Sequence, residues 1–171
     1  RDVRTEIRRF RFHSDQICYL LFAEAINGLS FRSEEIETPV AKTVVEKLAD
    51  EIVVIPVFRA GLAMLFGAMQ LLPKSKIGFV GYARDEQTAI AHEYYWKLPE
   101  LTEHSVVIVT DPMLATGGTI LHMLRRLTES GQKPKEVRVV SVVASPEGIQ
   151  AVHAEFPDVV IVCAAIDQGL N

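Results

Sequence analysis

The chain has 171 residues, of which 49% are hydrophobic and 23% charged, and these fractions are typical of a folded domain rather than a disordered chain. Its 18 lysines and arginines against 22 aspartates and glutamates give a charge of −4, which argues against a broad surface for nucleic acid. No apolar run reaches the roughly 18 residues that a membrane-spanning helix needs. The two cysteines lie far apart, so we expect buried thiols in a cytoplasmic domain with no nucleic-acid or membrane partner.

Residues 1–50 are expected to form a mainly helical N-terminal segment of one domain that covers residues 1–171. A helix is predicted to begin at Ser14, a favourable N-cap residue, and to end at Gly28. Apolar residues recur between these positions at helical spacing: Ile17, Leu20, Leu21 and Ala25. We interpret the basic stretch Arg1–Arg11 that precedes them as a solvated face.

Residues 51–171 are expected to form an α/β core, because short apolar runs here alternate with helical periodicity. Strands are predicted over 52–58, 77–82, 106–110, 137–144 and 159–165. Helices are predicted from Leu62, before Gly131 and from Pro146, with Ser145 as the cap of the last one. Since the strands are apolar on both faces, we expect a parallel sheet with helices on both sides.

Ligands of such sheets bind beyond the carboxyl ends of the strands, so the loops after Phe58, Tyr82 and Thr110 are the first candidates for a site. The third loop carries the clearest signal. Asp111 ends the strand, and small residues then open a helix: Ala115, Thr116, Gly117, Gly118 and Thr119. Main-chain amides at such a helix N-terminus favour a phosphate dianion, the threonines add hydroxyl donors, and the glycines let a ligand approach the backbone.

Other interpretations of this loop are weaker. It matches neither a Walker A loop nor a GxGxxG turn, because no lysine follows the glycines and the spacing differs. A glycine turn that only caps the helix is the remaining alternative. The buried strand and the terminal acid favour phosphate binding, with Asp111 placed to accept hydrogen bonds from two ribose hydroxyls.

The segment Asp111–Thr119, Asp-Pro-Met-Leu-Ala-Thr-Gly-Gly-Thr, resembles the phosphoribosyl-diphosphate motif of the uracil phosphoribosyltransferase family. Other segments resemble the same family in the same order: Arg59–Leu62, Arg84–Glu86, Glu93–Tyr95, Lys97–Pro99, Pro146–Gly148 and Ala164–Asp167. The resemblance implies a type I phosphoribosyltransferase fold, in which a parallel sheet is flanked by helices and a mobile β-arm covers residues 85–98. It also implies UMP synthesis from uracil and 5-phosphoribosyl 1-diphosphate, with Mg²⁺ bound mainly through the sugar diphosphate and no metal ligands assigned to the chain.

The same resemblance assigns three catalytic residues: Arg59 and Arg84 would bind the diphosphate, and Asp111 the ribose hydroxyls. Residues 115–119 would bind the 5′-phosphate. Substrate contacts are expected along the whole motif: Asp111, Pro112, Met113, Leu114, Ala115, Thr116, Gly117, Gly118 and Thr119. Displacement of diphosphate builds negative charge that fixed arginines stabilise. A salt-bridged structural Arg59 and an exposed charge cluster around Arg84 are the alternatives.

The chain departs from the family at several positions. Thr119 replaces a serine but keeps the hydroxyl, and Ala83 stands where a tyrosine often precedes the arginine. The family continues beyond Asn171 with segments that hold the pyrimidine, so we expect the C-terminal hood to be missing from these residues. Base selection is therefore open, and a type I phosphoribosyltransferase for another base and a non-catalytic nucleotide sensor are the rivals.

The chain is expected to assemble with further copies of itself. The helix-rich N-terminus and its apolar residues, like the resemblance, imply a homodimer or a higher homo-oligomer, and a GTP activator is compatible with the resemblance.

Overall fold

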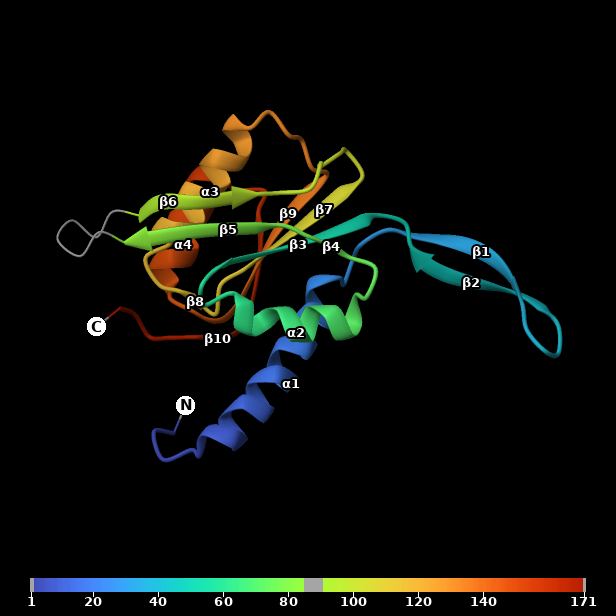
Figure 1. Cartoon of the computed structure of the whole chain (residues 1–171), viewed down its shortest axis with the longest axis horizontal. Helices are drawn as coiled ribbons and strands as arrows, with labels where there is room; N and C mark the ends of the chain where they lie inside the picture. Colours follow the sequence, from blue (N-terminus) through green and yellow to red (C-terminus); the bar gives the residue numbers. More distant parts are fainter. Residues whose placement is uncertain (1, 85–90, 171) are drawn as a thin grey trace.

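The computed structural model describes residues 2–84 and 91–170, except for the side chains of Arg84 and Ala91. Within these residues an eight-stranded sheet lies at the centre of the molecule (Figure 1). Its main strands follow the order β10-β9-β7-β3-β5-β6, while β4 pairs with β3 and β8 with β9. The strands are β3 (Glu51–Phe58), β4 (Lys76–Ile77), β5 (Phe79–Arg84), β6 (Ala91–Lys97), β7 (Ser105–Thr110), β8 (Met113–Leu114), β9 (Glu136–Ala144) and β10 (Val160–Ile166).

The paired strands run parallel, except that β5 and β6 are antiparallel. Every residue of β7 is buried, which agrees with the continuous apolar run Val106–Val109. The predicted strands are confirmed. The strand predicted over 77–82 is divided at Gly78, whose amide donates to the Val54 carbonyl of β3 at 3.0 Å.

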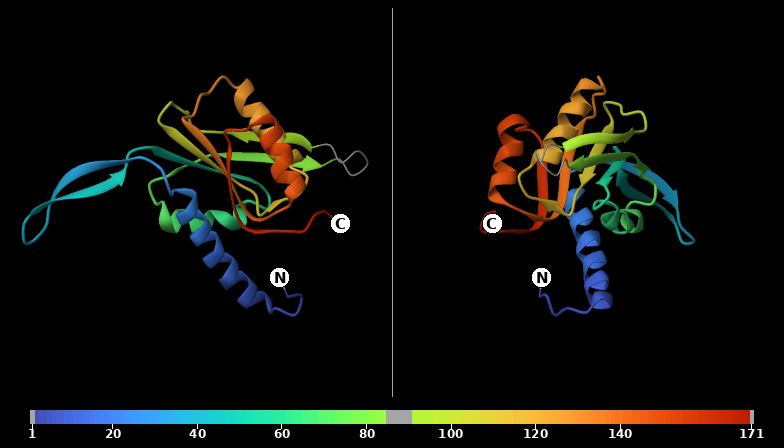
Figure 2. Two further views of the ribbon diagram at one scale, coloured as in Figure 1. Left: turned by 180° about the vertical axis from the view of Figure 1, so that it is seen from behind. Right: turned by 60° about the vertical axis from the view of Figure 1, so that its left-hand side comes forward.

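Helices cover both faces of the sheet, as the apolar strands predict. They are α1 (Ile7–Ala25), α2 (Leu62–Leu71), α3 (Gly118–Glu129) and α4 (Pro146–Glu155). The first pair packs on one face, where Phe22 and Met64 meet Ile108 of β7. The second pair packs on the other face, where Met123 and Val152 share a buried cluster with strand residues, and Figure 2 shows the two pairs on opposite sides. No helix in the described part of the chain is long and apolar enough to cross a membrane.

Two expectations for residues 1–50 are wrong. Helix α1 begins at Ile7, so Ser14 lies inside it rather than capping it. The arginines before Ser14 are good helix formers and extend the helix toward the N-terminus. Gly28, with a φ of 77°, follows the helix end as predicted.

The second correction concerns residues 31–48, which form an antiparallel hairpin instead of helix. Its strands are β1 (Phe31–Glu37) and β2 (Lys42–Leu48), and it extends away from the body of the molecule (Figure 1). Thr38 closes the turn, since its Oγ1 accepts from the Ala41 amide at 3.0 Å and donates to the Ala41 carbonyl at 2.7 Å. Cross-strand pairs such as Lys47–Glu34, 2.6 Å apart, add to the pairing.

A buried arginine of the sheet forms hydrogen bonds with the C-terminal end of α1. Arg138 of β9 is only 7% exposed. Its Nη1 donates to the carbonyls of Ala25 and Asn27 at 2.8 Å each, and its Nε donates to Glu136 Oε1 at 2.7 Å. These carbonyls lie at a helix C-terminus, where they lack partners within the helix and favour a cation.

Replacement of Arg138 by methionine is expected to lower the free energy of unfolding by about 3 kcal/mol, because Glu136 and two carbonyls lose their buried partner. Urea denaturation measures the change. Arg125→Met is the control, since Arg125 pairs with Glu155 at an exposed site and such pairs contribute about 1 kcal/mol or less. Equal losses in the two variants would contradict this role for Arg138.

Candidate functional site

The candidate site lies at the carboxyl edge of the sheet, where β3, β5 and β7 end. Pro56 of β3 pairs with Thr110 of β7, and Phe58 pairs with Gly81 of β5, so the three strands end side by side. The loops after β3 and β7 carry Arg59 and Asp111. The structure therefore brings together two residues that the sequence predicted to act together, and we call Arg59–Gly61 with Asp111–Thr119 the carboxyl-edge site.

The turn after β3 presses against the end of β7. Thr110 Oγ1 donates to the Gly61 carbonyl at 3.4 Å. A Cβ on Gly61 would lie 2.3 Å from the Thr110 carbonyl oxygen, so only glycine fits here. The peptide bond between Phe58 and Arg59 is cis. This close packing fixes where Arg59 leaves the sheet.

The side chain of Arg59 is exposed, and none of the carboxylates in the described part of the chain forms an ion pair with it. Among the described residues, the interpretation of Arg59 as a salt-bridged structural residue thus finds no partner carboxylate, and the role of Arg59 stays a prediction. Its guanidinium faces solvent at the carboxyl edge, where it can meet an anionic ligand.

Arg84 is the last residue of β5, the strand beside β3. Its side chain and residues 85–90 lie outside the described residues, so its diphosphate role and the mobile arm stay predictions. The described part of the arm is β6, which runs antiparallel to β5.

The motif that begins at Asp111 is attached to β9. The Asp111 amide donates to the Val140 carbonyl at 3.2 Å, and the Pro112 carbonyl accepts from the amides of Val142 and Val143 at 3.1 Å each. Met113 and Leu114 form β8, which extends this pairing. Leu114 is buried, which leaves only its main chain for a ligand, whereas the Met113 side chain is exposed.

The loop that follows β8 ends at the N-terminus of α3. Gly117, with a φ of 78°, precedes the first helical residue, Gly118. The Gly118 amide donates to Thr116 Oγ1 at 3.4 Å. The first amides of a helix have no partners within it, and they lie at the positive end of the helix dipole. Together with the threonine hydroxyls, this loop can bind a phosphate group.

The loop of residues 115–119, which we call the phosphate loop for its proposed ligand, packs on the first turn of α4. Ser145 Oγ donates to the Ala115 carbonyl and accepts from the Gly148 amide at 2.9 Å, which confirms its predicted capping role. A Cβ on Gly148 would lie 2.3 Å from the Ala115 carbonyl oxygen. Sequence reasoning missed this support, although the segment Pro146–Gly148 is among those that resemble the family.

Metal binding by side chains alone finds no support in the described residues, where no group of three or more His, Cys, Asp or Glu could hold an ion. Mg²⁺ commonly binds through one or two carboxylates, water and substrate phosphates. The carboxyl-edge site, with Asp111 as its acid, fits an ion that arrives on a phosphorylated substrate.

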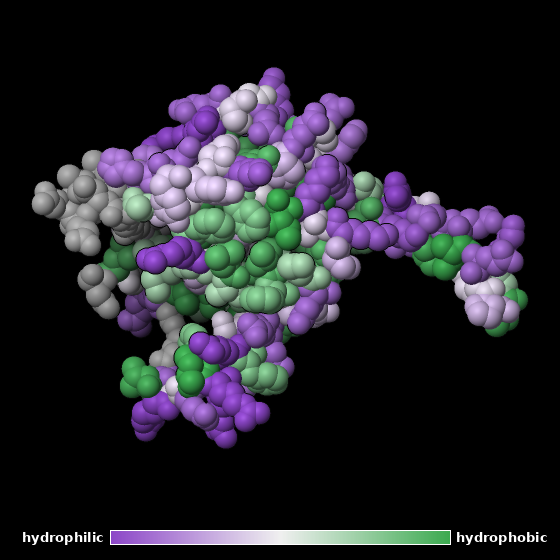
Figure 3. Space-filling view, in the orientation of Figure 1, coloured by the Kyte–Doolittle hydropathy of each residue, from purple (hydrophilic) through white to green (hydrophobic). Residues whose placement is uncertain are grey.

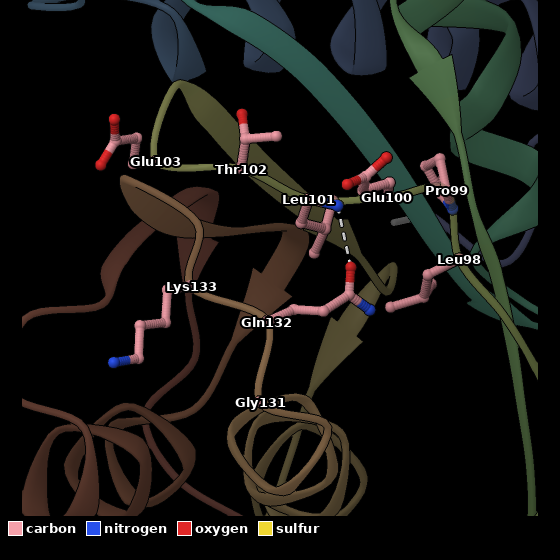
Figure 4. A pocket seen from close by; sticks show the side chains of 9 residues that line it. All are labelled: Leu98, Pro99, Glu100, Leu101, Thr102, Glu103, Gly131, Gln132 and Lys133. Carbon is pink, nitrogen blue, oxygen red and sulfur yellow. Dashed lines mark hydrogen bonds between the residues drawn. The ribbon is translucent and has the colours of Figure 1, made fainter.

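A separate hollow lies away from this site. A groove of about 770 Å³ is formed by residues 98–103, which precede β7, and residues 131–133, which follow α3 (Figure 4). Gln132 Oε1 accepts from the Leu101 amide at 2.8 Å and so holds the two segments together. Because this groove lies at the amino end of β7, it is separate from the loops that carry Arg59 and Asp111.

Comparison with known proteins agrees with this geometry. Residues 1–171 match the family model of uracil phosphoribosyltransferase. A uracil phosphoribosyltransferase of Campylobacter fetus is 43% identical over 171 residues, which are 100% of this chain and 81% of the relative. One from Limosilactobacillus fermentum is 42% identical over 173 residues, with 100% and 82% covered.

Solved structures extend the comparison. A protein from Aquifex aeolicus superimposes with a TM-score of 0.89 at 36% identity, covering 98% of this chain and 80% of that one. A purine phosphoribosyltransferase from Pyrococcus horikoshii gives a TM-score of 0.61 at 13% identity, covering 92% and 85%. The latter likeness shows a shared fold alone.

Proposed function

This chain belongs to the uracil phosphoribosyltransferase family, and we propose that its carboxyl-edge site transfers the phosphoribosyl group of 5-phosphoribosyl 1-diphosphate to N1 of uracil. The products are UMP and diphosphate, so the chain is a pentosyltransferase of pyrimidine salvage. One observation carries the proposal. A loop of small residues at a helix N-terminus follows Asp111 after the short strand β8, and an exposed arginine lies at the end of the adjacent parallel strand.

The loop and the acid bind the sugar. Main-chain amides of residues 115–119 receive the 5′-phosphate, and the helix dipole favours its two negative charges. The Asp111 carboxylate accepts hydrogen bonds from the ribose hydroxyls, which holds the anomeric carbon in one place. Such fixed positioning lowers the entropy cost of the reaction.

The arginines act on the leaving group. N1 of uracil forms a bond to the anomeric carbon while the bond from that carbon to the diphosphate oxygen breaks. The bonding electrons leave with diphosphate, and the N1 proton is released to water. The Arg59 guanidinium binds the oxygens that gain charge, in a forked geometry that suits phosphate. Arg84, at the end of β5, is proposed to share this task. When bound to the diphosphate, Mg²⁺ neutralises part of its charge.

Turnover assays with uracil, hypoxanthine, guanine and orotate test the function. We expect UMP from uracil and 5-phosphoribosyl 1-diphosphate, detected by chromatography, and no purine nucleotide. Activity with a purine and none with uracil would overturn the assignment.

Replacement of Asp111 by asparagine is expected to lower kcat/KM for the sugar diphosphate by about 10- to 100-fold, since hydrogen bonds to a charged group contribute about 1.5–3 kcal/mol. The fold should persist, because the asparagine oxygen can still accept from the Met113 amide, which lies 3.3 Å from Asp111 Oδ1. Asp158→Asn, an exposed change, is the control. Wild-type kinetics in the Asp111 variant would remove this residue from the site.

We also propose that the chain works as a homodimer or a higher homo-oligomer. Support comes from apolar side chains that remain exposed on α1 and α2, among them Phe10 and Phe66. Figure 3 shows apolar groups gathered over α2, and such patches commonly mark protein interfaces. Sedimentation velocity would measure the mass of the particle.

A cytoplasmic location is proposed as well, because Cys18 and Cys163 are both free thiols. A GTP activator stays a prediction.

A further inference from the structure

The side chain of Arg126 links helix α3 to β6. Its Nε lies 3.4 Å from Glu93 Oε2, and its Cζ lies 5.3 Å from the centroid of the Trp96 ring. Both partners belong to β6, whereas α3 is the helix that begins at the phosphate loop. We propose that Arg126 is a positioning residue, which holds the β5–β6 hairpin in place relative to the phosphate-binding helix. This inference rests on the proposed function.

Main-chain bonds alone hold the hairpin weakly. Within the described residues, β5 pairs with β3 at two positions, Val57 with Val80 and Phe58 with Gly81. The pairing of β5 with β6 shifts register between Gly81 and Tyr82. Strand β6 forms the edge of the sheet and has no further strand beyond it in the described order. Side-chain contacts must therefore help to set the orientation of the hairpin.

The hairpin has such contacts on two sides. On one side Tyr95 stacks on Phe58, with ring centroids 5.7 Å apart and planes at 22°, directly before Arg59. On the other side Arg126 contacts Glu93 and Trp96. Because β5 ends at Arg84, the orientation of the hairpin determines where that strand end lies relative to the phosphate loop.

The surroundings of Arg126 strengthen its contacts. Tyr82 pairs with Glu93 across the ladder, and the Tyr82 hydroxyl is buried without a hydrogen-bond partner among the described residues. Burial raises the pKa of Tyr82, and the nearby Glu93 carboxylate raises it further, while Arg126 lowers it. A cation between a carboxylate and an aromatic ring interacts more strongly where water is partly excluded.

The neighbouring arginine provides a matched control. Arg125 precedes Arg126 on α3 but points to α4, where its Nε donates to Glu155 Oε1 at 2.7 Å. Both arginines are partly exposed and both form an ion pair, yet only Arg126 contacts the hairpin. Loss of Arg125 therefore controls for loss of charge and of one ion pair on the same helix.

The test measures steady-state kinetics and the fluorescence of Trp96, the only tryptophan of the chain. We expect Arg126→Met to raise KM for 5-phosphoribosyl 1-diphosphate by about 3- to 10-fold, to shift Trp96 emission to longer wavelength and to increase its quenching by acrylamide. Arg126→Lys should recover part of the loss, because lysine keeps the charge without the planar fork. Arg125→Met should leave both readouts unchanged.

A double-mutant cycle with Glu93→Gln isolates the contact. If Glu93 acts through Arg126, the double variant should have the KM of Arg126→Met alone rather than the product of the two effects. Thermal unfolding shows whether each variant is folded. If Arg126→Met does not fold, the KM and Trp96 emission of Arg126→Lys and Glu93→Gln are used for the test instead. Unchanged KM in Arg126→Met with altered Trp96 emission would overturn the proposal, as would an equal rise in Arg125→Met.

Failure of the proposed function gives a different result. If the wild-type chain makes no UMP, the role of Arg126 is tested by binding instead. Calorimetry then compares the affinity of wild type and of Arg126→Met for 5-phosphoribosyl 1-diphosphate. Weaker binding by Arg126→Met than by wild type supports that role. Equal binding, or no binding by wild type, overturns it.

Discussion

Replacement of Arg59 by alanine is expected to lower kcat/KM for 5-phosphoribosyl 1-diphosphate by about 10²- to 10³-fold, the size of effect seen when one preorganised charge-stabilising group is lost. Arg59 projects from the turn after β3, and Gly61 in the same turn lies against the end of β7. Its exposed guanidinium has no ion-pair partner among the described carboxylates. We propose that this charge meets an anion that arrives with the substrate.

The lysine variant separates charge from geometry. Arg59→Lys should lose less than Arg59→Ala, because lysine keeps the cation but cannot offer two parallel hydrogen bonds. Both variants should unfold at the wild-type temperature, since the side chain is exposed. Arg32→Ala on the distant hairpin is the control and should keep full activity. Equal kcat/KM for Arg59→Ala and wild type would remove Arg59 from the site.

Replacement of Gly148 by alanine is expected to have the second large effect, although no substrate contact is assigned to Gly148. The new Cβ would lie 2.3 Å from the Ala115 carbonyl oxygen and 2.9 Å from that of Leu114, so the phosphate loop must move. Overpacking of this kind costs about 1–3 kcal/mol of stability. A displacement of about 1 Å at the reacting groups can lower activity by about 100-fold.

Thermal unfolding and kinetics on the folded protein measure the two effects of Gly148→Ala. Gln150→Ala, at an exposed position of the same helix, is the matched control and should change neither quantity. Calorimetry measures the affinity for ribose 5-phosphate, which depends on the shape of the phosphate loop. Wild-type affinity in the Gly148 variant would show that the loop keeps its shape.

The hydrophobic pattern predicted the central strands correctly, because a strand that is covered on both faces needs an apolar side chain at almost every position. The runs in β3 and β7 are apolar throughout, and both strands are covered by helices on two faces. The hairpin of residues 31–48 was missed, because its strands have few buried positions and many charged ones. The hairpin is held by main-chain pairing, by the turn at Thr38 and by cross-strand ion pairs, and none of these contributes to an apolar pattern.

The part of the site that follows from the order and direction of the strands could be predicted from the sequence. Parallel strands end at one edge, so the alternation of strands and helices in the sequence suffices to place Arg59 and Asp111 together. The support of the loop by α4 could not be predicted in this way, because Ala115 and Gly148 meet only once β8 has paired with β9. The same holds for Arg126, since nothing in the sequence distinguishes it from Arg125. Contacts between elements that are distant in the chain depend on tertiary packing, which local sequence patterns do not predict.

The hydroxyl of Ser145 donates to the Ala115 carbonyl and accepts from the Gly148 amide, so one oxygen atom serves both the start of a helix and the shape of the loop that we propose binds the substrate. Alanine would remove both bonds, whereas threonine keeps a hydroxyl that can make both. We therefore expect a substitution at Ser145 to change thermal stability and turnover together.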